Sequence, residues 1–318
     1  MTSTNSDSIR EQLTLDKNMV SSEGIRSIQD PTLIRDSRVL ANVLLAPDLS
    51  QVKCTNYFDV LQPELKPHMR KIVAEWMMEV SEDQGCQPDV FPLAISYMDR
   101  ILARVAIKKS QFQLLACVCL FIASKYKETS PLCVDKLVVF TDFSTTDMEI
   151  RTWELLILEL LNWDLHSVTA QCIASQIIHR MDQSRCPVDL GELQRLTSTL
   201  TSMTLTEFSL VHTLDSVQIG TASLLLATKL LEGKLDHQSG YFSDDLHRNL
   251  SIITKMSKRE INRCMLLIEN LFGGDMDVPV LKQQPPFHSP RSQKYAKTCN
   301  EHSSITTTPT DLLSMVVI

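Results

Sequence analysis

Two eight-residue segments of this 318-residue chain are near copies of each other. The first, FIASKYKE, runs from Phe121 to Glu128, and the second, LLATKLLE, runs from Leu225 to Glu232. Each ends a hydrophobic stretch that is too apolar for a surface helix and too short to cross a bilayer. Repeats of about 20–50 residues indicate solenoids, but here the two lysines lie 104 positions apart (229 minus 125). The repeat therefore predicts two domain-sized units, each with a buried central helix.

The composition is that of a globular protein, with 43% hydrophobic and 22% charged residues. The net charge of −7 argues against a nucleic-acid partner, because such a surface needs a field of lysine and arginine side chains. The first 20 residues hold no apolar block of signal-peptide length, so we expect an intracellular protein without a membrane partner.

The sequence lacks the motifs of common catalytic and cofactor sites. None of its eight glycines forms G-x-G-x-x-G or a P-loop, and H-E-x-x-H and G-x-S-x-G are absent. Its nine cysteines include no C-x-x-C pair, which favours free buried thiols over zinc ligands or disulfides. We therefore expect a protein that is not an enzyme and that binds no cofactor and no metal.

Helical periodicity dominates the first half of the chain. A helix is predicted from Pro31 to Leu45, and it precedes five further helical patterns, at 69–80, 89–103, 110–127, 131–140 and 144–161. Within Phe112–Ala123 only Gln113 is polar. That segment is the predicted central helix of the first unit, because a helix that is apolar all round must be buried.

The second half repeats this count with helical patterns at 168–181, 189–212, 215–232, 243–255 and 257–272, and Gly273-Gly274 is expected to end the last helix. No segment alternates with period two, so the fold class is all-α with two tandem five-helix domains and an N-terminal helix. We expect a flexible arm at 1–30, a first unit with its preceding helix at 31–166, a second unit at 167–275 and a disordered regulatory tail at 276–318.

Several linked motifs resemble the cyclin family, whose fold is a pair of five-helix cyclin boxes. They are MRKIVAEW at 69–76, YMDR at 97–100, ASKYKE at 123–128, WELL at 153–156 and LNWDL at 161–165. The strings MRKIV and KETSPL, with the C-terminal Thr308-Pro309-Thr310-Asp311, are most similar to D-type (G1/S-specific) cyclins. The likeness covers about residues 33–275 and the extreme C-terminus. One departure is the absence of the L-x-C-x-E string with which such cyclins dock retinoblastoma-type proteins.

The resemblance implies a regulatory subunit that binds and activates a cyclin-dependent kinase, of the four/six class, to drive the G1/S transition. It implies R-x-L-containing substrates and inhibitors, a retinoblastoma-type protein as substrate, and residence in nucleus and cytoplasm. The alternatives are a cyclin-fold adaptor or scaffold without kinase activation, similar to transcription factor IIB or independent of kinases, and a stand-alone helical enzyme. A basic face or a zinc ribbon would favour the adaptor, and a catalytic cluster would favour the enzyme.

Arg70 and Asp99 both lie among apolar neighbours in the sequence. An unpaired buried charge is costly, since breaking a buried pair costs about 3–5 kcal/mol. Cyclins pair the matching arginine and aspartate, so the resemblance assigns these two residues to a structural ion pair. The alternative is two independently solvated charges.

Lys125 and Glu154 are the principal candidates for kinase binding. By spacing alone, the lysine could snorkel from its apolar helix and the glutamate could face solvent. The resemblance implies instead that the pair hydrogen-bonds backbone groups of the segment leading into the kinase's mobile regulatory helix, because charge-assisted bonds to backbone fix a loop whatever its side chains. The further kinase-binding candidates are Phe121, Tyr126, Glu128 and Leu156.

A second candidate site lies mainly along the first predicted helix of the first unit, at 69–80. Its residues resemble the cyclin groove for R-x-L peptides and are Met69, Ile72, Val73, Trp76, Glu79 and Gln113. An apolar trough flanked by one carboxylate and one amide suits a short Arg-x-Leu peptide. The alternative is that this Met/Ile/Trp stripe is simply core.

Thr308, followed by Pro309, is the candidate phosphorylation site. A phosphate there would add about −1.5 to −2 charges and three strong acceptors. Its place in a tail without packing pattern, and its likeness to the degron of D-type cyclins, imply control of nuclear export and degradation. The alternative is one more threonine in a polar run.

Overall fold

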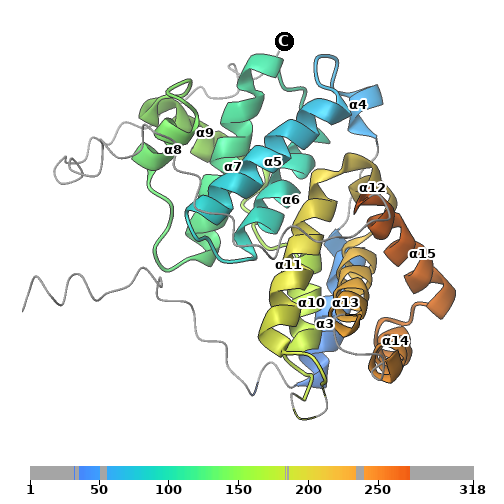
Figure 1. Cartoon of the computed structure of the whole chain (residues 1–318). Coiled ribbons are helices and arrows are strands. Elements are labelled where there is room, and N and C mark those ends of the chain that lie inside the picture. The colour runs from blue at the N-terminus through green and yellow to red at the C-terminus, as the bar shows by residue number, and fades with distance from the viewer. Residues whose placement is uncertain are drawn as a thin grey trace, which may run out of the picture.

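The computed structural model describes residues 32, 36–50, 56–182, 184, 186–233 and 240–272. These ranges are folded into helices joined by short turns, and no strand occurs among them (Figure 1). The prediction of an all-α protein is confirmed.

The first group of helices surrounds one apolar helix. The group comprises α5 (Pro67–Asp83), α6 (Val90–Leu102), α7 (Phe112–Lys127), α8 (Val134–Phe140) and α9 (Asp147–Leu160). Helix α7 packs against α5, α6 and α9, and its residues 112–124 are buried apart from Gln113. The apolar pattern therefore predicted this central helix correctly. Helix α9 begins with a capping box in which Thr146 and Glu149 satisfy each other's backbone N–H groups.

The second group is built around the other copy of the repeat. It comprises α10 (Ala170–Ile178), α11 (Leu190–Thr206), α12 (Phe208–Thr213), α13 (Ser216–Glu232), α14 (Gly240–Thr254) and α15 (Lys258–Glu269). Helix α13 packs against α10, α11, α14 and α15. The approach of α10 is so close that a Cβ atom on Gly220 would lie 2.5 Å from the carbonyl oxygen of Ala170. Only glycine fits there without a shift of the helices.

One predicted helix is divided in two. The pattern at 189–212 predicted a single helix, but α11 ends at Thr206 and α12 begins at Phe208. Glu207 between them has extended backbone angles (φ −89°, ψ 107°). The last carbonyl groups of α11 have no partner within the helix, and Arg70 from the first group donates to those of Leu205 and Thr206. A contact between the two groups therefore stabilises the break.

The N-terminal helix, predicted from Pro31 to Leu45, is observed as α3 (Ser37–Ser50). Although it precedes the first group in sequence, it packs against α10 and α13 of the second (Figure 1). Arg180 helps to fix its start by donating to the Asp36 carbonyl at 2.9 Å. Short helix α4 (Tyr57–Val60) then brings the chain to α12, where the rings of Tyr57 and Phe208 meet at 5.0 Å.

The described part of the chain ends in a 3-10 turn, Asn270–Phe272, and the predicted Gly273-Gly274 stop lies outside the described residues. No helix within the described ranges is long and apolar enough to span a membrane. In the same ranges, no group of three or more His, Cys, Asp or Glu side chains could hold a metal ion. Cys117, Cys119 and Cys264 are buried free thiols, and burial raises the pKa of Cys117 to about 12.

Candidate functional site

Arg70 and Asp99 form a buried ion pair between α5 and α6. The guanidinium donates from Nε to Oδ1 at 2.8 Å and from Nη2 to Oδ2 at 2.7 Å. Arg70 is 0% and Asp99 4% exposed. Burial alone would lower the pKa of Arg70, but the Asp99 carboxylate outweighs burial and the pKa is raised. The bidentate geometry of the pair offsets the desolvation of both groups.

The pair extends into a network that joins the two groups of helices. Tyr57 donates its hydroxyl to Asp99 at 2.8 Å, and Arg70 Nη1 donates to the carbonyls of Leu205 and Thr206 at 3.1 Å each. The guanidinium carbon also lies 5.8 Å from the centre of the Phe208 ring. One arginine thus ties α5 to α6 and to the α11–α12 junction.

These additional hydrogen-bond partners of Arg70 and Asp99 were not predicted from the sequence. An arginine has five N–H donors and a single carboxylate satisfies two of them, so further acceptors were to be expected around a buried guanidinium. Nothing in the sequence showed that the acceptors were carbonyls more than 130 residues away. Lys71 makes a parallel surface bridge to Glu207, the residue at the helix break.

Lys125 and Glu154 lie side by side at the surface of the first group. Their Nζ and Oε1 atoms are 2.6 Å apart, with side chains 43% and 16% exposed. The ammonium group also lies 4.3 Å from the centre of the Phe121 ring. The fold therefore places a donor-rich cation and an acceptor-rich anion together at the junction of α7 and α9, half open to solvent.

The other kinase-binding candidates are mostly turned inward in this chain. Phe121 and Leu156 are only 3% and 2% exposed and belong to the hydrophobic core, so they support the Lys125–Glu154 surface from below. Glu128 accepts from the Gln87 backbone N–H at 2.9 Å and from the Ser124 hydroxyl at 2.8 Å, which makes it a link between loops. Tyr126 is 45% exposed and lies in the last turn of α7.

The predicted groove residues lie along an outer face of α5. Ile72 is 62% exposed, while Met69, Val73 and Trp76 are partly buried. The Trp76 indole donates to the Phe140 carbonyl at 3.3 Å, at the end of α8. Ile72 is thus open to solvent, whereas Met69, Val73 and Trp76 pack against the edge of the hydrophobic core.

The polar groove residues lie close to this stripe. Glu79 is exposed near the end of α5, and Gln113, in the first turn of α7, accepts from the Ser144 hydroxyl at 3.4 Å. Helices α5 and α7 pack directly against each other. The candidate phosphorylation site Thr308 lies outside the described residues.

The fold defined by this pair of helix groups is the cyclin fold. A solved viral cyclin from herpesvirus saimiri matches with a TM-score of 0.58 at 23% identity, covering 74% of this chain and 100% of its own. A family model described as the cyclin N-terminal domain matches residues 40–166.

More specific relatives come from the G1/S-specific cyclins. Cyclin-D3 of Bos taurus is 45% identical over 160 residues, which is 50% of this chain and 54% of the relative. Cyclin-D2 of Xenopus laevis is 35% identical over 246 residues, 77% of this chain and 83% of the relative. The chain therefore belongs to the D-type cyclins. It spans about half the length of the cyclin-D3 relatives that it matches.

Proposed function

We propose that this chain is a non-enzymatic regulatory subunit that binds and activates a cyclin-dependent kinase of the four/six class at the G1/S transition. Membership in the D-type cyclins supports the regulatory role. The observation that carries the proposal is the exposed Lys125–Glu154 pair, because its location and chemistry suit the capture of a backbone segment.

The pair would act as a two-pronged clamp. The ammonium group of Lys125 offers N–H donors to backbone carbonyls, and the Glu154 carboxylate accepts from backbone N–H groups. In the free chain each group satisfies the other at 2.6 Å, so the site is preorganised and no isolated charge is exposed. The clamp would hold the kinase's regulatory helix inward, completing the Lys–Glu ion pair and metal geometry that phosphoryl transfer requires. ATP, magnesium and the catalytic aspartate would belong to the kinase.

The groove along α5 would dock R-x-L substrates and inhibitors. The exposed Ile72 and the half-buried Met69 and Trp76 offer an apolar trough for a leucine side chain. Glu79 would meet the basic residue of the peptide, and Gln113 its backbone. A retinoblastoma-type protein that carries such a motif would then be a substrate without the L-x-C-x-E string.

The tail would add regulation. Phosphorylation at Thr308 would create an acidic ligand for a degradation or export factor. Residence in both nucleus and cytoplasm is part of this proposal.

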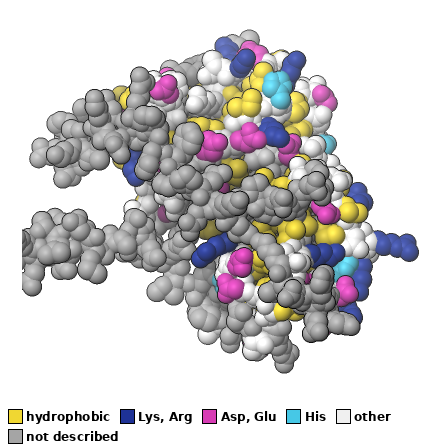
Figure 2. Space-filling view, in the orientation of Figure 1, with side chains coloured by type: hydrophobic (Ala, Val, Ile, Leu, Met, Phe, Trp, Pro, Cys, Tyr) yellow, Lys and Arg dark blue, Asp and Glu magenta, His cyan; other side chains and the backbone are white. Residues whose placement is uncertain are grey.

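The competing functions make different demands on the surface. A nucleic-acid adaptor needs a basic face, but on the face shown in Figure 2 the described lysine and arginine side chains are interspersed with acidic ones. A scaffold that does not activate a kinase would still have the R-x-L groove but would not bind an active kinase.

Purification of the tagged chain from dividing cells tests the proposal. We expect a cyclin-dependent kinase to co-purify in stoichiometric amount and the complex to phosphorylate a retinoblastoma peptide. A stable chain that purifies without kinase, or with kinase that remains inactive, would contradict the proposal and favour the scaffold.

A further inference from the structure

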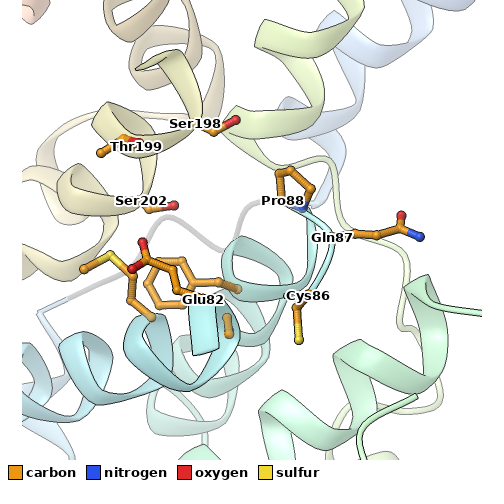
Figure 3. Close-up of a pocket in the computed structure, with 10 residues that line it drawn as sticks. Glu82, Cys86, Gln87, Pro88, Ser198, Thr199 and Ser202 are labelled. Carbon is orange, nitrogen blue, oxygen red and sulfur yellow. The ribbon is translucent and has the colours of Figure 1, made fainter. Parts of the chain in front are cut away.

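A cleft between the two groups of helices has no part in the function proposed above. It is lined by the end of α5, the loop into α6, the start of α6 and the middle of α11 (Figure 3). The lining residues are Met78, Ser81, Glu82, Cys86, Gln87, Pro88, Phe91, Ser198, Thr199 and Ser202. Its volume is about 170 Å³. Sites for drug-sized ligands are about 300–1,000 Å³, so this cleft is suited to a single side chain.

The cleft lies on a different face of α5 from the R-x-L groove. Successive residues of an α-helix turn by about 100°, so Met78 and Glu82 face nearly opposite to Met69 and Trp76. The groove side of α5 faces α7 and the end of α8, whereas the cleft side faces α11. The apolar part of the groove and the cleft are therefore separate surfaces, and Glu79 of the groove is the charge nearest to Glu82 of the cleft.

Two of the hydroxyl groups that line the cleft already donate their hydrogens within the chain. Ser81 donates its hydroxyl hydrogen to the Met77 carbonyl at 2.8 Å, and Thr199 donates to that of Arg195 at 3.1 Å. The oxygens of these two hydroxyls can therefore only accept further bonds. Ser198 already accepts from Gln171 at 2.7 Å. A ligand with several donors therefore suits the Ser81 and Thr199 oxygens and the Glu82 carboxylate, while Ser198 keeps its own hydroxyl hydrogen.

A carboxylate at the mouth of the cleft sets the charge of that ligand. Figure 3 shows Glu82 directed toward the α11 side, where Ser202 lies. Within the described residues the Glu82 carboxylate has no hydrogen bond and no ion pair. Glu82 is exposed to solvent, and partial desolvation, followed by the like charge of Glu79, raises its pKa, so a cation there would relieve an unfavourable environment. No lysine or arginine is among the lining residues.

The remaining walls are apolar. They include Met78 from α5, Pro88 from the loop and Phe91 from α6, and Phe91 is buried. An arginine combines an apolar stem, a planar head that stacks on such surfaces and five donors. A lysine would supply three donors and no planar face, which fits the spread of acceptors less well.

We propose that this cleft between the helix groups is a receptor for one arginine side chain of a partner polypeptide, with Glu82 as its anionic anchor. The guanidinium would pair with Glu82 and donate to the α11 hydroxyls, while its stem packs on Met78 and Pro88. A protein that carries such an arginine would contact both helix groups at once. This proposal does not depend on kinase binding.

The test uses the full chain labelled with ¹³C at its methionine methyl groups, with Met78 assigned from a Met78→Leu variant. The probe is the peptide acetyl-Ala-Ala-Arg-Ala-Ala-amide, and its counterpart carries neutral citrulline in place of arginine. We expect the arginine peptide to shift the Met78 resonance saturably and the citrulline peptide to bind roughly two- to fivefold more weakly, because citrulline has no charge to pair with an exposed carboxylate. Met69 should not respond, because it reports on the other face of α5.

Two variants separate the anchor from general surface charge. Glu82→Gln should weaken binding of the arginine peptide roughly two- to fivefold, whereas Asp83→Asn, at a neighbouring carboxylate of α5 that does not line the cleft, should leave it nearly unchanged. Equal binding of both peptides, a shift of Met69 alone, or an unchanged affinity in Glu82→Gln would each overturn the proposal. So would the absence of any Met78 shift at millimolar peptide.

Discussion

Replacing Arg70 by methionine tests whether the buried ion pair joins the two helix groups. The variant keeps an unbranched apolar stem but removes the guanidinium, so it leaves the Asp99 charge buried without its cation. It also removes the donor of the Leu205 and Thr206 carbonyls. Breaking a buried pair on one side costs about 3–5 kcal/mol. For domains of about 150–250 residues each kcal/mol lowers the Tm by about 2–4 °C, so a loss of ~4 kcal/mol lowers it by ~8–16 °C.

Urea denaturation followed by circular dichroism measures this loss, with Lys71→Met as the matched control. Lys71 lies next to Arg70 and also bridges to the helix break, but its pair with Glu207 is exposed and should contribute about 1 kcal/mol or less. The double variant Arg70→Met/Asp99→Leu should cost less than the sum of its single variants, because it leaves no unpaired charge. An Arg70→Met loss no greater than that of Lys71→Met would refute the reasoning.

Three further predictions concern the groove, the pH response and the tail. Trp76→Ala should weaken docking of R-x-L substrates by roughly 2 kcal/mol and spare activity on short peptides without the motif; equal losses would indicate core damage. Burial lowers the pKa of His247 below 6.5. The unfolded chain therefore binds the proton more readily than the folded chain, and the free energy of unfolding falls as the pH drops below 6.5. His247→Leu should flatten this pH dependence in urea titrations. Thr308→Ala should lengthen the half-life in a cycloheximide chase, and an unchanged half-life would remove the degron.

The sequence predicted the elements that depend on local pattern. The apolar run at 112–124 and the near-repeat placed a buried helix at the centre of each group, and both are observed as α7 and α13. Such patterns are reliable because a helix without a polar face can only be buried. The pairing of Arg70 with Asp99 came from the family resemblance, since periodicity alone left two solvated charges as an alternative.

What the sequence did not predict depends on contacts between distant segments. The residues on both sides of Glu207 are compatible with a single helix. The helix is broken where the carbonyl groups of Leu205 and Thr206 accept hydrogen bonds from Arg70 instead. The docking of α3 on the second group is a similar case, because the sequence of α3 does not show which group it contacts. Phe121 and Leu156 are buried. Their spacing in the sequence did not show whether they face the core or the solvent, since both lie in stretches that are apolar on several faces.

The most direct test of the central proposal exchanges the charges of the exposed pair. Lys125→Glu and Glu154→Lys are each compared with the double exchange, and Arg248→Glu in the exposed Arg248–Asp245 pair of α14 serves as control. All variants should keep wild-type helicity and Tm within a few degrees. The measurement is the amount of cyclin-dependent kinase that co-purifies with each.

Both single exchanges should reduce kinase recovery about tenfold or more, because each replaces charge-assisted bonds with repulsion. The double exchange restores the internal ion pair but reverses donor and acceptor toward the partner, so it should remain defective, while the Arg248→Glu control binds normally. Stoichiometric kinase with both single variants, or full recovery in the double exchange, would contradict the assignment of this pair as the kinase clamp.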